Sequence, residues 1–183
     1  MLVGLYASLE KKRLDLSDPS IDLYAAWNIP PSKQGLEKAG LAIPPQITDR
    51  GIKINNHQDY SSTITTAGCI SPWHIDQCNC GTLILVVDGF KLFIVCPPTE
   101  KNRKYFESID CFGDPSRVKD ALNELEQLRY YVVRAGDMFV LPPGELHAVI
   151  SPVNSAITAW LCHKDDWEKD IDELMQWEKR DRS

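Results

Sequence analysis

Short runs of β-branched and aromatic residues dominate the chain from Ser61 onward. The runs are SSTITTAGCI, GTLILVVDG, FKLFIVCPP, YYVVRAGD, MFVLPPGE, HAVISPV and SAITAWLC. Gly, Pro, Asp and Asn residues separate them at close intervals, as is typical of antiparallel strands joined by tight connections. The Asp88-Gly89 pair predicts a hairpin between the second and third runs. The pattern as a whole predicts a mainly β fold, either an antiparallel barrel or a double-sheet sandwich.

Helical patterns flank and interrupt these strands. Two of them, EKNRKYFESI and PSRVKDALNELEQL, predict helices inside an insert at about 100–128. The segment DDWEKDIDELMQWEKR places its apolar residues on one helical face, which would pack on the barrel or on a second subunit. We therefore expect a helical and loop segment over 1–60 that packs on the barrel, the barrel itself over 61–163, and a C-terminal helix over 164–183.

Charge and cysteine usage narrow the class of protein. The net charge of −6 argues against a nucleic-acid surface, because phosphate binding needs clustered Lys and Arg, but it is compatible with a basic peptide as partner. The cysteines fall largely in apolar runs without the framework of a small secreted domain, which indicates a reducing intracellular compartment. The opening MLVGLYASLEKKRLDL is too soon interrupted by charge for a signal peptide or a membrane span. The sequence does not define the oligomeric state.

A His-X-Asp motif offers two side chains that can bind a metal ion. His74 and Asp76 follow an extended segment, so their side chains point to the same face and can reach one ion. A lone motif of this kind is more often a solvated or hydrogen-bonded pair. His147, which follows a rigid Pro-Pro-Gly turn at the start of a later strand, would complete a facial triad. The sequence therefore predicts an iron site with two histidines and one carboxylate.

The same motifs resemble those of the JmjC family of iron(II) and 2-oxoglutarate dioxygenases. The resemblance covers about Ile70 to His163 and rests on SPWHID, VVDGFKLFIVCPPTEKNRKYFES and VVRAGDMFVLPPGELHAVISPVNSAITAW. Within that family, the sequence looks most like the histone lysine demethylases that carry F-box or PHD-finger modules. It implies a double-stranded β-helix, that is, a cupin-like jelly-roll barrel with flanking and inserted helices. It also implies a nuclear protein that uses Fe(II), 2-oxoglutarate and O2.

The resemblance assigns roles to five positions. His74, Asp76 and His147 would bind the iron and take part in catalysis, Lys91 would pair with the distal carboxylate of 2-oxoglutarate, and Ser71 would add a hydroxyl to that carboxylate. The role of Lys91 has a physical reason, because a carboxylate buried in a barrel is costly without a cation beside it. Two simpler alternatives stay open. Lys91 would otherwise extend outward beside a turn, and Ser71 would serve only as a turn residue.

Two departures from the family pattern affect the expected function. Ile84 stands where similar demethylases often have a Tyr that contacts 2-oxoglutarate, and QCNCGT replaces the usual Gly-Gly-Thr after the His-X-Asp motif. The leading expectation is a dioxygenase that hydroxylates or demethylates a lysine side chain of a histone or another protein. One alternative is an inactive JmjC-like module that binds or scaffolds chromatin. A small cupin metalloenzyme independent of 2-oxoglutarate is another.

Overall fold

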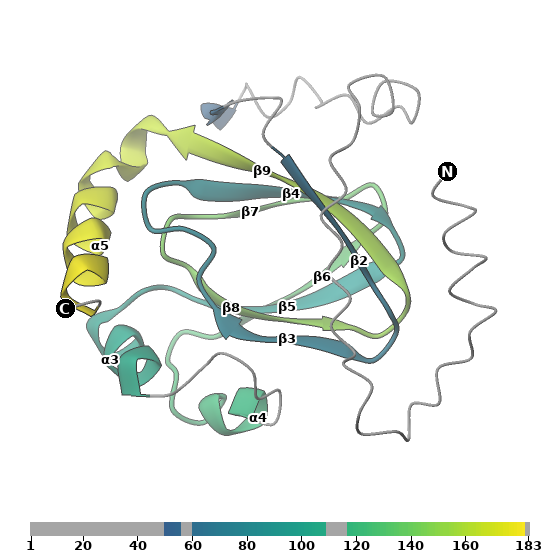
Figure 1. Ribbon diagram of the computed structural model, residues 1–183, viewed down its shortest axis with the longest axis horizontal. Helices are drawn as coiled ribbons and strands as arrows, with labels where there is room; N and C mark the ends of the chain where they lie inside the picture. The colour runs from purple at the N-terminus through teal and green to yellow at the C-terminus, as the bar shows by residue number, and fades with distance from the viewer. Residues whose placement is uncertain (1–49, 56–59, 109–116, 182–183) are drawn as a thin grey trace.

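Two facing antiparallel sheets form most of the molecule (Figure 1). The computed structural model describes residues 50–55, 60–108 and 117–181, so most of the segment expected over 1–60 lies outside the described residues. The strands of the first sheet are β1 (Ile52–Ile54), β2 (Tyr60–Thr65), β4 (Gly81–Asp88), β7 (Met138–Leu141) and β9 (Ser155–Lys164). Those of the second sheet are β3 (Cys69–His74), β5 (Phe90–Cys96), β6 (Arg129–Arg134) and β8 (Leu146–Ser151).

The strand order identifies the barrel type. The first sheet runs β1-β9-β4-β7, with β2 also paired to β9, and the second runs β3-β8-β5-β6. The chain thus passes from sheet to sheet at nearly every connection after β2, with β5 and β6 as the exception. This interleaving is that of a jelly roll, which confirms the expected cupin-like double-stranded β-helix. An apolar cluster lies between the sheets and includes Ile84, Val86, Phe93, Val95, Val133, Leu141 and Val149.

The predicted hairpin at Asp88-Gly89 is wrong. The strands on either side of it, β4 and β5, belong to different sheets and do not pair with each other. Gly89 has a φ of 72°, and a Cβ there would lie 2.3 Å from the carbonyl oxygen of Asn154. The Asp-Gly pair therefore makes a tight corner between the sheets. Its turn chemistry suits both connections, so local sequence does not distinguish them.

Helices cover the outer face of the second sheet. α3 (Glu100–Ser108) and α4 (Arg117–Ala121) lie beside β3, β5 and β8 in Figure 1. α4 is shorter than the helix predicted from PSRVKDALNELEQL, because the chain leaves helical geometry after Ala121. Leu125 is nevertheless buried in the same apolar cluster as Ala121, so tertiary packing replaces the missing helical turns.

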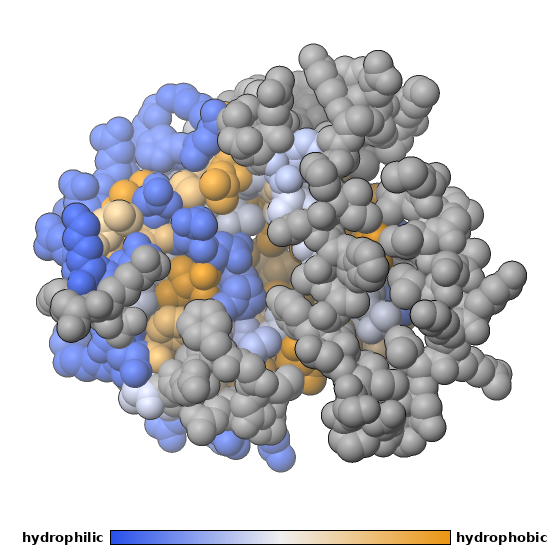
Figure 2. All heavy atoms as spheres, in the orientation of Figure 1, coloured by the Kyte–Doolittle hydropathy of each residue, from blue (hydrophilic) through white to orange (hydrophobic). Residues whose placement is uncertain are grey.

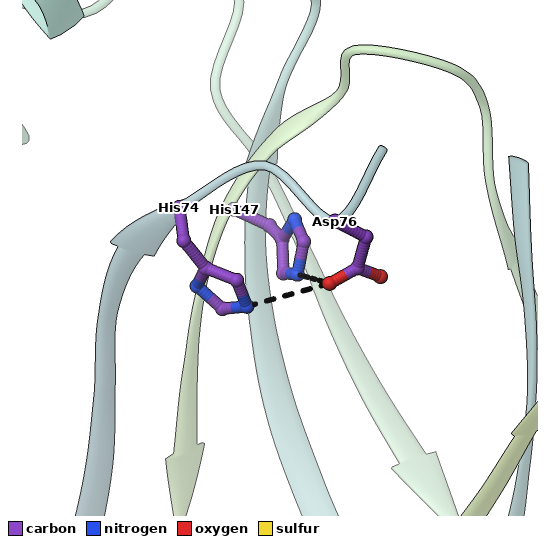
Figure 3. A group of neighbouring side chains, drawn as sticks. All are labelled: His74, Asp76 and His147. Atoms are coloured by element: carbon purple, nitrogen blue, oxygen red, sulfur yellow. Dashed lines mark ion pairs between the residues drawn. The ribbon is translucent and has the colours of Figure 1, made fainter. Parts of the chain in front are cut away.

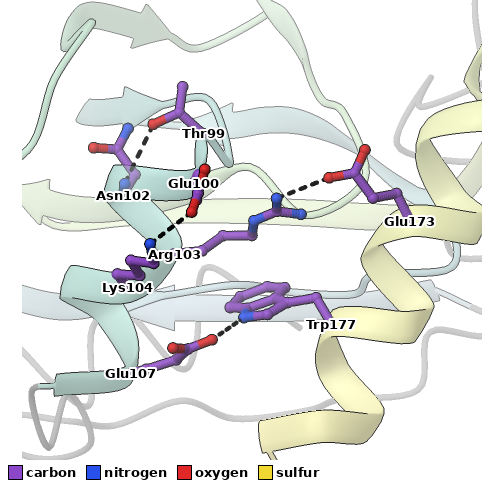
Figure 4. Close-up of polar contacts among 8 residues, drawn as sticks. All are labelled: Thr99, Glu100, Asn102, Arg103, Lys104, Glu107, Glu173 and Trp177. Carbon is purple, nitrogen blue, oxygen red and sulfur yellow. Dashed lines mark hydrogen bonds and ion pairs between the residues drawn. The ribbon is translucent and has the colours of Figure 1, made fainter.

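The C-terminal helix closes one end of the barrel. A short 3-10 helix, η2 (Asp165–Trp167), leads into α5 (Glu168–Asp181), whose Leu174 and Trp177 are buried against Cys78. Polar contacts join α5 to α3: Arg103 donates to Glu173 at 2.8 Å, and the Trp177 indole donates to Glu107 (Figure 4). The outer surface of this end is mainly hydrophilic (Figure 2). Of the two packing modes expected for this helix, the structure shows packing on the barrel.

One strand lies within the segment for which helix and loop are expected. β1 pairs with the end of β9, where Ile52 is opposite Lys164 and Ile54 is opposite Cys162. Ile52 is buried and Lys53 is exposed, the alternation of a strand with one covered face. Across the described ranges, no helix has the length and apolar character needed to cross a membrane.

Candidate metal centre

The three predicted ligands come together at one end of the barrel interior (Figure 3). His74 ends β3 and His147 lies near the start of β8, and the ladder between these strands sets the two residues opposite each other. Asp76 follows in the loop after β3. Its Oδ1 lies 3.6 Å from Nε2 of each histidine, and all three ligand atoms lie within 4.8 Å of one another. Within the described ranges, this is the one group of three or more His, Cys, Asp or Glu side chains that could hold a metal ion.

Hydrogen bonds orient both imidazole rings for metal binding. His74 Nδ1 donates to the carbonyl oxygen of Pro72 at 2.7 Å, and His147 Nδ1 donates to that of Glu145 at 3.0 Å. In the neutral ring this leaves Nε2 without a proton, so its lone pair faces Asp76. Burial, followed by the nearby His74, lowers the pKa of His147 to about 4, although Asp76 opposes the shift. His147 is therefore neutral at pH 7, as a metal ligand must be.

The distances suit an ion better than direct hydrogen bonds. At 3.6 Å, the carboxylate oxygen is too far from either Nε2 for a hydrogen bond. Bonds of about 2.1 Å from a divalent metal would place neighbouring ligand atoms about 3 Å apart, which small side-chain rotations would achieve. Two imidazoles and one carboxylate on one side of an ion leave positions open for other ligands, as in non-haem iron oxygenases. The donor set therefore fits Fe(II).

Backbone contacts tie together the two segments that carry the ligands. The Gly144 amide, in the turn before His147, donates to the carbonyl oxygen of Gln77, next to Asp76, at 2.9 Å. Gly144 has a φ of 69°, and a Cβ there would come within 2.7 Å of Leu174 on α5. The glycine thus allows the closing helix to approach the turn. α5 in this way supports the segment that positions His147.

A cavity of about 530 Å³ contains all five site residues predicted from the sequence. His74, Asp76 and His147 line it together with Lys91 and Ser71. Other walls come from Tyr60, Thr63, Thr65, Gln77, Ile84, Phe93, Val149, Ile157 and Trp160. The candidate metal ligands and the buried lysine therefore share one space inside the barrel.

Lys91 points into the barrel, which answers one alternative left open by the sequence. Its side chain is 2% exposed, and Nζ donates to Thr65 Oγ1 at 2.8 Å and to Ser151 Oγ at 3.0 Å. Burial lowers its pKa to about 8. In the part of the chain that the structure describes, no carboxylate pairs with it. A charged amine at this depth, held by neutral groups alone, could be balanced by an anion in the cavity.

Two residues near Lys91 were missed in the sequence. Thr65 ends β2 and Ser151 ends β8, and both side chains are almost fully buried. Hydroxyl residues are common in strands, and nothing in STIT or HAVIS distinguishes a hydroxyl that faces a lysine. The one available signal is that Ser151 closes the mainly apolar strand LHAVIS, whereas Thr65 closes a strand, YSSTIT, that is already rich in hydroxyl residues.

Ser71 and Ile84 occupy different walls of the cavity. Ser71 is half-buried on β3, opposite Val149 of β8. Ile84 is 3% exposed on β4 and lies between Phe139 of β7 and Ala159 of β9. Ile84 therefore places an apolar side chain at the position where the resemblance leads us to expect a Tyr hydroxyl.

Comparisons with known proteins match half of the chain. No family model matches it. It is 27% identical over 92 residues to JmjC domain-containing histone demethylation protein 1 of Cryptococcus neoformans, covering 49% of this chain and 10% of that protein. Identity is 30% over 95 residues to the protein of the same name from Aspergillus fumigatus, covering 51% and 7%. Identity to lysine-specific demethylase 2A of Xenopus tropicalis is 26% over 96 residues, covering 51% and 8%.

A solved structure aligns with part of this chain. The Drosophila melanogaster CENP-C cupin domain aligns with 60% of this chain and 64% of its own at 11% identity and a TM-score of 0.40. The sequence matches thus cover about half of this chain and a tenth or less of the three relatives named above. Over that half, the chain is similar to JmjC domain-containing histone demethylases, which supports a JmjC family.

Proposed function

We propose that this chain is an Fe(II)- and 2-oxoglutarate-dependent dioxygenase of the JmjC type that hydroxylates or demethylates a lysine side chain of a histone or another protein. One observation carries the proposal: the His74, Asp76 and His147 cluster and the buried Lys91 line the same cavity. A metal site alone would suit many cupins. A buried cation in the same space suits a co-substrate that has a carboxylate at each end.

The residues at the two ends of the cavity would have different roles. His74, Asp76 and His147 would hold the metal, with the histidine tautomers fixed by the carbonyl oxygens of Pro72 and Glu145. When bound, iron with O2 would supply the oxidative decarboxylation of 2-oxoglutarate and the hydroxylation of a C–H bond.

Lys91 and Ser71 would orient the co-substrate. Lys91 would neutralise its distal carboxylate, and the Ser71 hydroxyl would donate to the same group. The apolar walls of Ile84, Phe93 and Val149 would exclude water around the carbon chain between the two ends. The keto acid end would then face the three metal ligands.

The substrate assignment follows the relatives. The printed names of the matched proteins describe histone demethylation and lysine-specific demethylation. A basic histone tail as substrate is compatible with the net charge of −6, and the nucleus would be the place of action. Since the named matches cover half of this chain, the substrate and its methylation state are part of the proposal.

Ile84 favours one second candidate. Its buried side chain removes the polar contact that a Tyr would offer to 2-oxoglutarate. A JmjC-like module that retains the metal but turns over slowly or not at all, and binds chromatin instead, is therefore the alternative.

Succinate formation separates the two candidates. Purified protein loaded with Fe(II) should convert 2-oxoglutarate to succinate, and a panel of methylated histone peptides should stimulate the reaction and release formaldehyde if demethylation occurs. Asp76→Ala should abolish turnover. If the protein binds metal but forms no succinate with any of the peptides, the chromatin-binding module is the remaining candidate function.

A further inference from the structure

Hydroxyl groups surround the ammonium of Lys91. Lys91 Nζ donates to the hydroxyls of Thr65 and Ser151. A second layer of contacts links Thr65 Oγ1 to Ser151 Oγ at 3.0 Å and to Ser155 Oγ at 2.8 Å. We call Thr65, Ser151 and Ser155 the hydroxyl cluster. All three are at most 4% exposed. Thr65 and Ser155 belong to the first sheet and Ser151 to the second, so the cluster joins the sheets at Lys91.

Thr65 is the centre of the hydroxyl cluster. A hydroxyl donates one hydrogen bond and accepts two, and Thr65 Oγ1 has three partners: Lys91, Ser151 and Ser155. Its bonding capacity is filled, so its role is to hold other groups in place. The ammonium of Lys91 has three N–H donors, and the hydroxyl cluster takes two of them. For the third there is no acceptor within the described ranges, and Lys91 lines the cavity.

Hydroxyls hold a cation without cancelling its charge. A buried carboxylate beside Lys91 would form an internal ion pair and weaken the attraction of the site for an anion. Hydroxyl dipoles instead replace part of the lost water and leave a full positive charge facing the cavity. The titratable group that acts on Lys91 from another strand of its sheet is Cys69 on β3, while β2, β8 and β9 present the hydroxyl cluster.

We infer that Thr65 is a positioning residue for the co-substrate. Through the hydroxyl cluster it fixes Lys91 Nζ and keeps the third N–H available to an incoming carboxylate. The identity of that ligand, 2-oxoglutarate, rests on the proposed function. The hydrogen bonds between Lys91 and the hydroxyl cluster do not depend on which ligand binds.

Three variants isolate this role. Thr65→Val keeps the β-branched shape and removes the hydroxyl, and Thr65→Ser keeps the hydroxyl. Thr158→Val is the matched control: Thr158 is 3% exposed, and its hydroxyl pairs with Ser62 at 3.1 Å between the same two strands, β2 and β9. Thr158 is not among the cavity residues.

Two measurements on each variant distinguish the inference from the proposed function. The first is the titration midpoint of Lys91 in metal-free protein, followed by carbon-13 NMR of the lysine Cε, with Lys91→Met to assign the signal. The second is the Kd of 2-oxoglutarate for Mn(II)-loaded protein, by calorimetry. The first needs neither metal nor co-substrate.

In Thr65→Val we expect the Lys91 midpoint to fall by about one pH unit and 2-oxoglutarate to bind about tenfold more weakly near neutral pH, as for the loss of one hydrogen bond to a charged group. The loss of affinity should grow as the pH rises.

Thr65→Ser and Thr158→Val should stay within about twofold of the wild type, since each leaves the bond to Lys91 in place. A Lys91 midpoint unchanged in Thr65→Val would overturn the inference, as would equal effects of Thr65→Val and Thr158→Val. Wild-type protein that binds no 2-oxoglutarate would contradict the proposed function, and the NMR midpoint would then decide the role of Thr65 alone.

Discussion

His74 and His147 are directly opposite each other in the β3–β8 ladder, with ring centroids 4.0 Å apart. The ladder has an irregularity between Ser71 and His74, just before this pair. A shift of one residue in either strand would turn one ring to the other face of the sheet. The geometry of the candidate metal centre is therefore tied to the register of two strands that are distant in the sequence.

Replacing one ligand should remove metal binding. We expect His74→Ala to lower the affinity for Mn(II) or Fe(II) by at least about 100-fold, because loss of an outer partner of a ligand alone costs about 10- to 100-fold. His163→Ala is the matched control, since His163 lies on β9 outside the cluster. Calorimetry measures both. Equal metal affinity in His74→Ala and His163→Ala would place the metal elsewhere.

The charge of Lys91 should be needed for 2-oxoglutarate but not for the metal. Lys91→Met keeps most of the length of the side chain and removes the ammonium. We expect the Kd of 2-oxoglutarate to rise about 10- to 100-fold, as for the loss of a hydrogen bond to a charged group. Metal affinity should be unchanged. Lys53→Met, at an exposed lysine paired with Asp165, is the control. Similar 2-oxoglutarate affinity in both variants would remove the proposed role of Lys91.

The same substitution should alter stability in a pH-dependent way. Burial lowers the pKa of Lys91 from 10.5 to about 8. Below pH 8 the lysine is charged in both the folded and unfolded states, so the folded state bears the full cost of the buried charge, about 3 kcal/mol. As the pH rises from 8 toward 10.5, the folded state loses the proton while the unfolded state keeps it, and the cost disappears.

Urea unfolding of wild type and Lys91→Met checks this. We expect the variant to be the more stable protein at pH 7, by less than the full cost because the hydroxyl cluster loses a partner. The advantage should shrink steadily above pH 8. Comparing the two proteins also cancels the opposite contribution of Cys96 and Cys162, whose pKa values burial raises to about 12. An advantage that stays constant with pH would show that Lys91 is not the group responsible.

Gly144 should couple the closing helix to the metal centre. Gly144→Ala places a Cβ at a φ of 69°, close to Leu174, and Gly136→Ala places one at a φ of 89° with nothing within 4 Å. Both should lose about 1 kcal/mol for the left-handed conformation, and Gly144→Ala should lose about 1–2 kcal/mol more from overpacking. Thermal unfolding measures this difference. Gly144→Ala alone should also weaken metal binding, because its amide is bonded to Gln77 beside Asp76.

The sequence predicts those parts of this protein that depend on local pattern. Alternating apolar residues and frequent turns indicate a β barrel, and the His-X-Asp spacing indicates that His74 and Asp76 lie close together, although Asp76 is in the loop after β3. The choice of His147 needs only a histidine at the start of a later strand. The lysine in DGFKLF is suspected as buried because its strand neighbours are apolar.

The remaining features depend on how distant strands meet. The contact of Ser151 with Lys91 follows from the pairing of β5 with β8, and that of Thr65 from the packing of the two sheets, which no local motif records. Asp88-Gly89 has the chemistry of a hairpin, yet the sheets separate there because β4 finds its partners in β7 and β9. Likewise, α4 ends at Ala121 although the helical pattern continues, and Leu125 still packs in the same apolar cluster as Ala121.

The most direct test of the account is a crystal structure of the protein with Mn(II) and 2-oxoglutarate. We expect one metal ion bound by Nε2 of His74 and His147 and by the Asp76 carboxylate, with the distal carboxylate of 2-oxoglutarate within hydrogen-bond distance of Lys91 Nζ. A metal bound to other residues, or 2-oxoglutarate whose distal carboxylate lies away from Lys91, would contradict it.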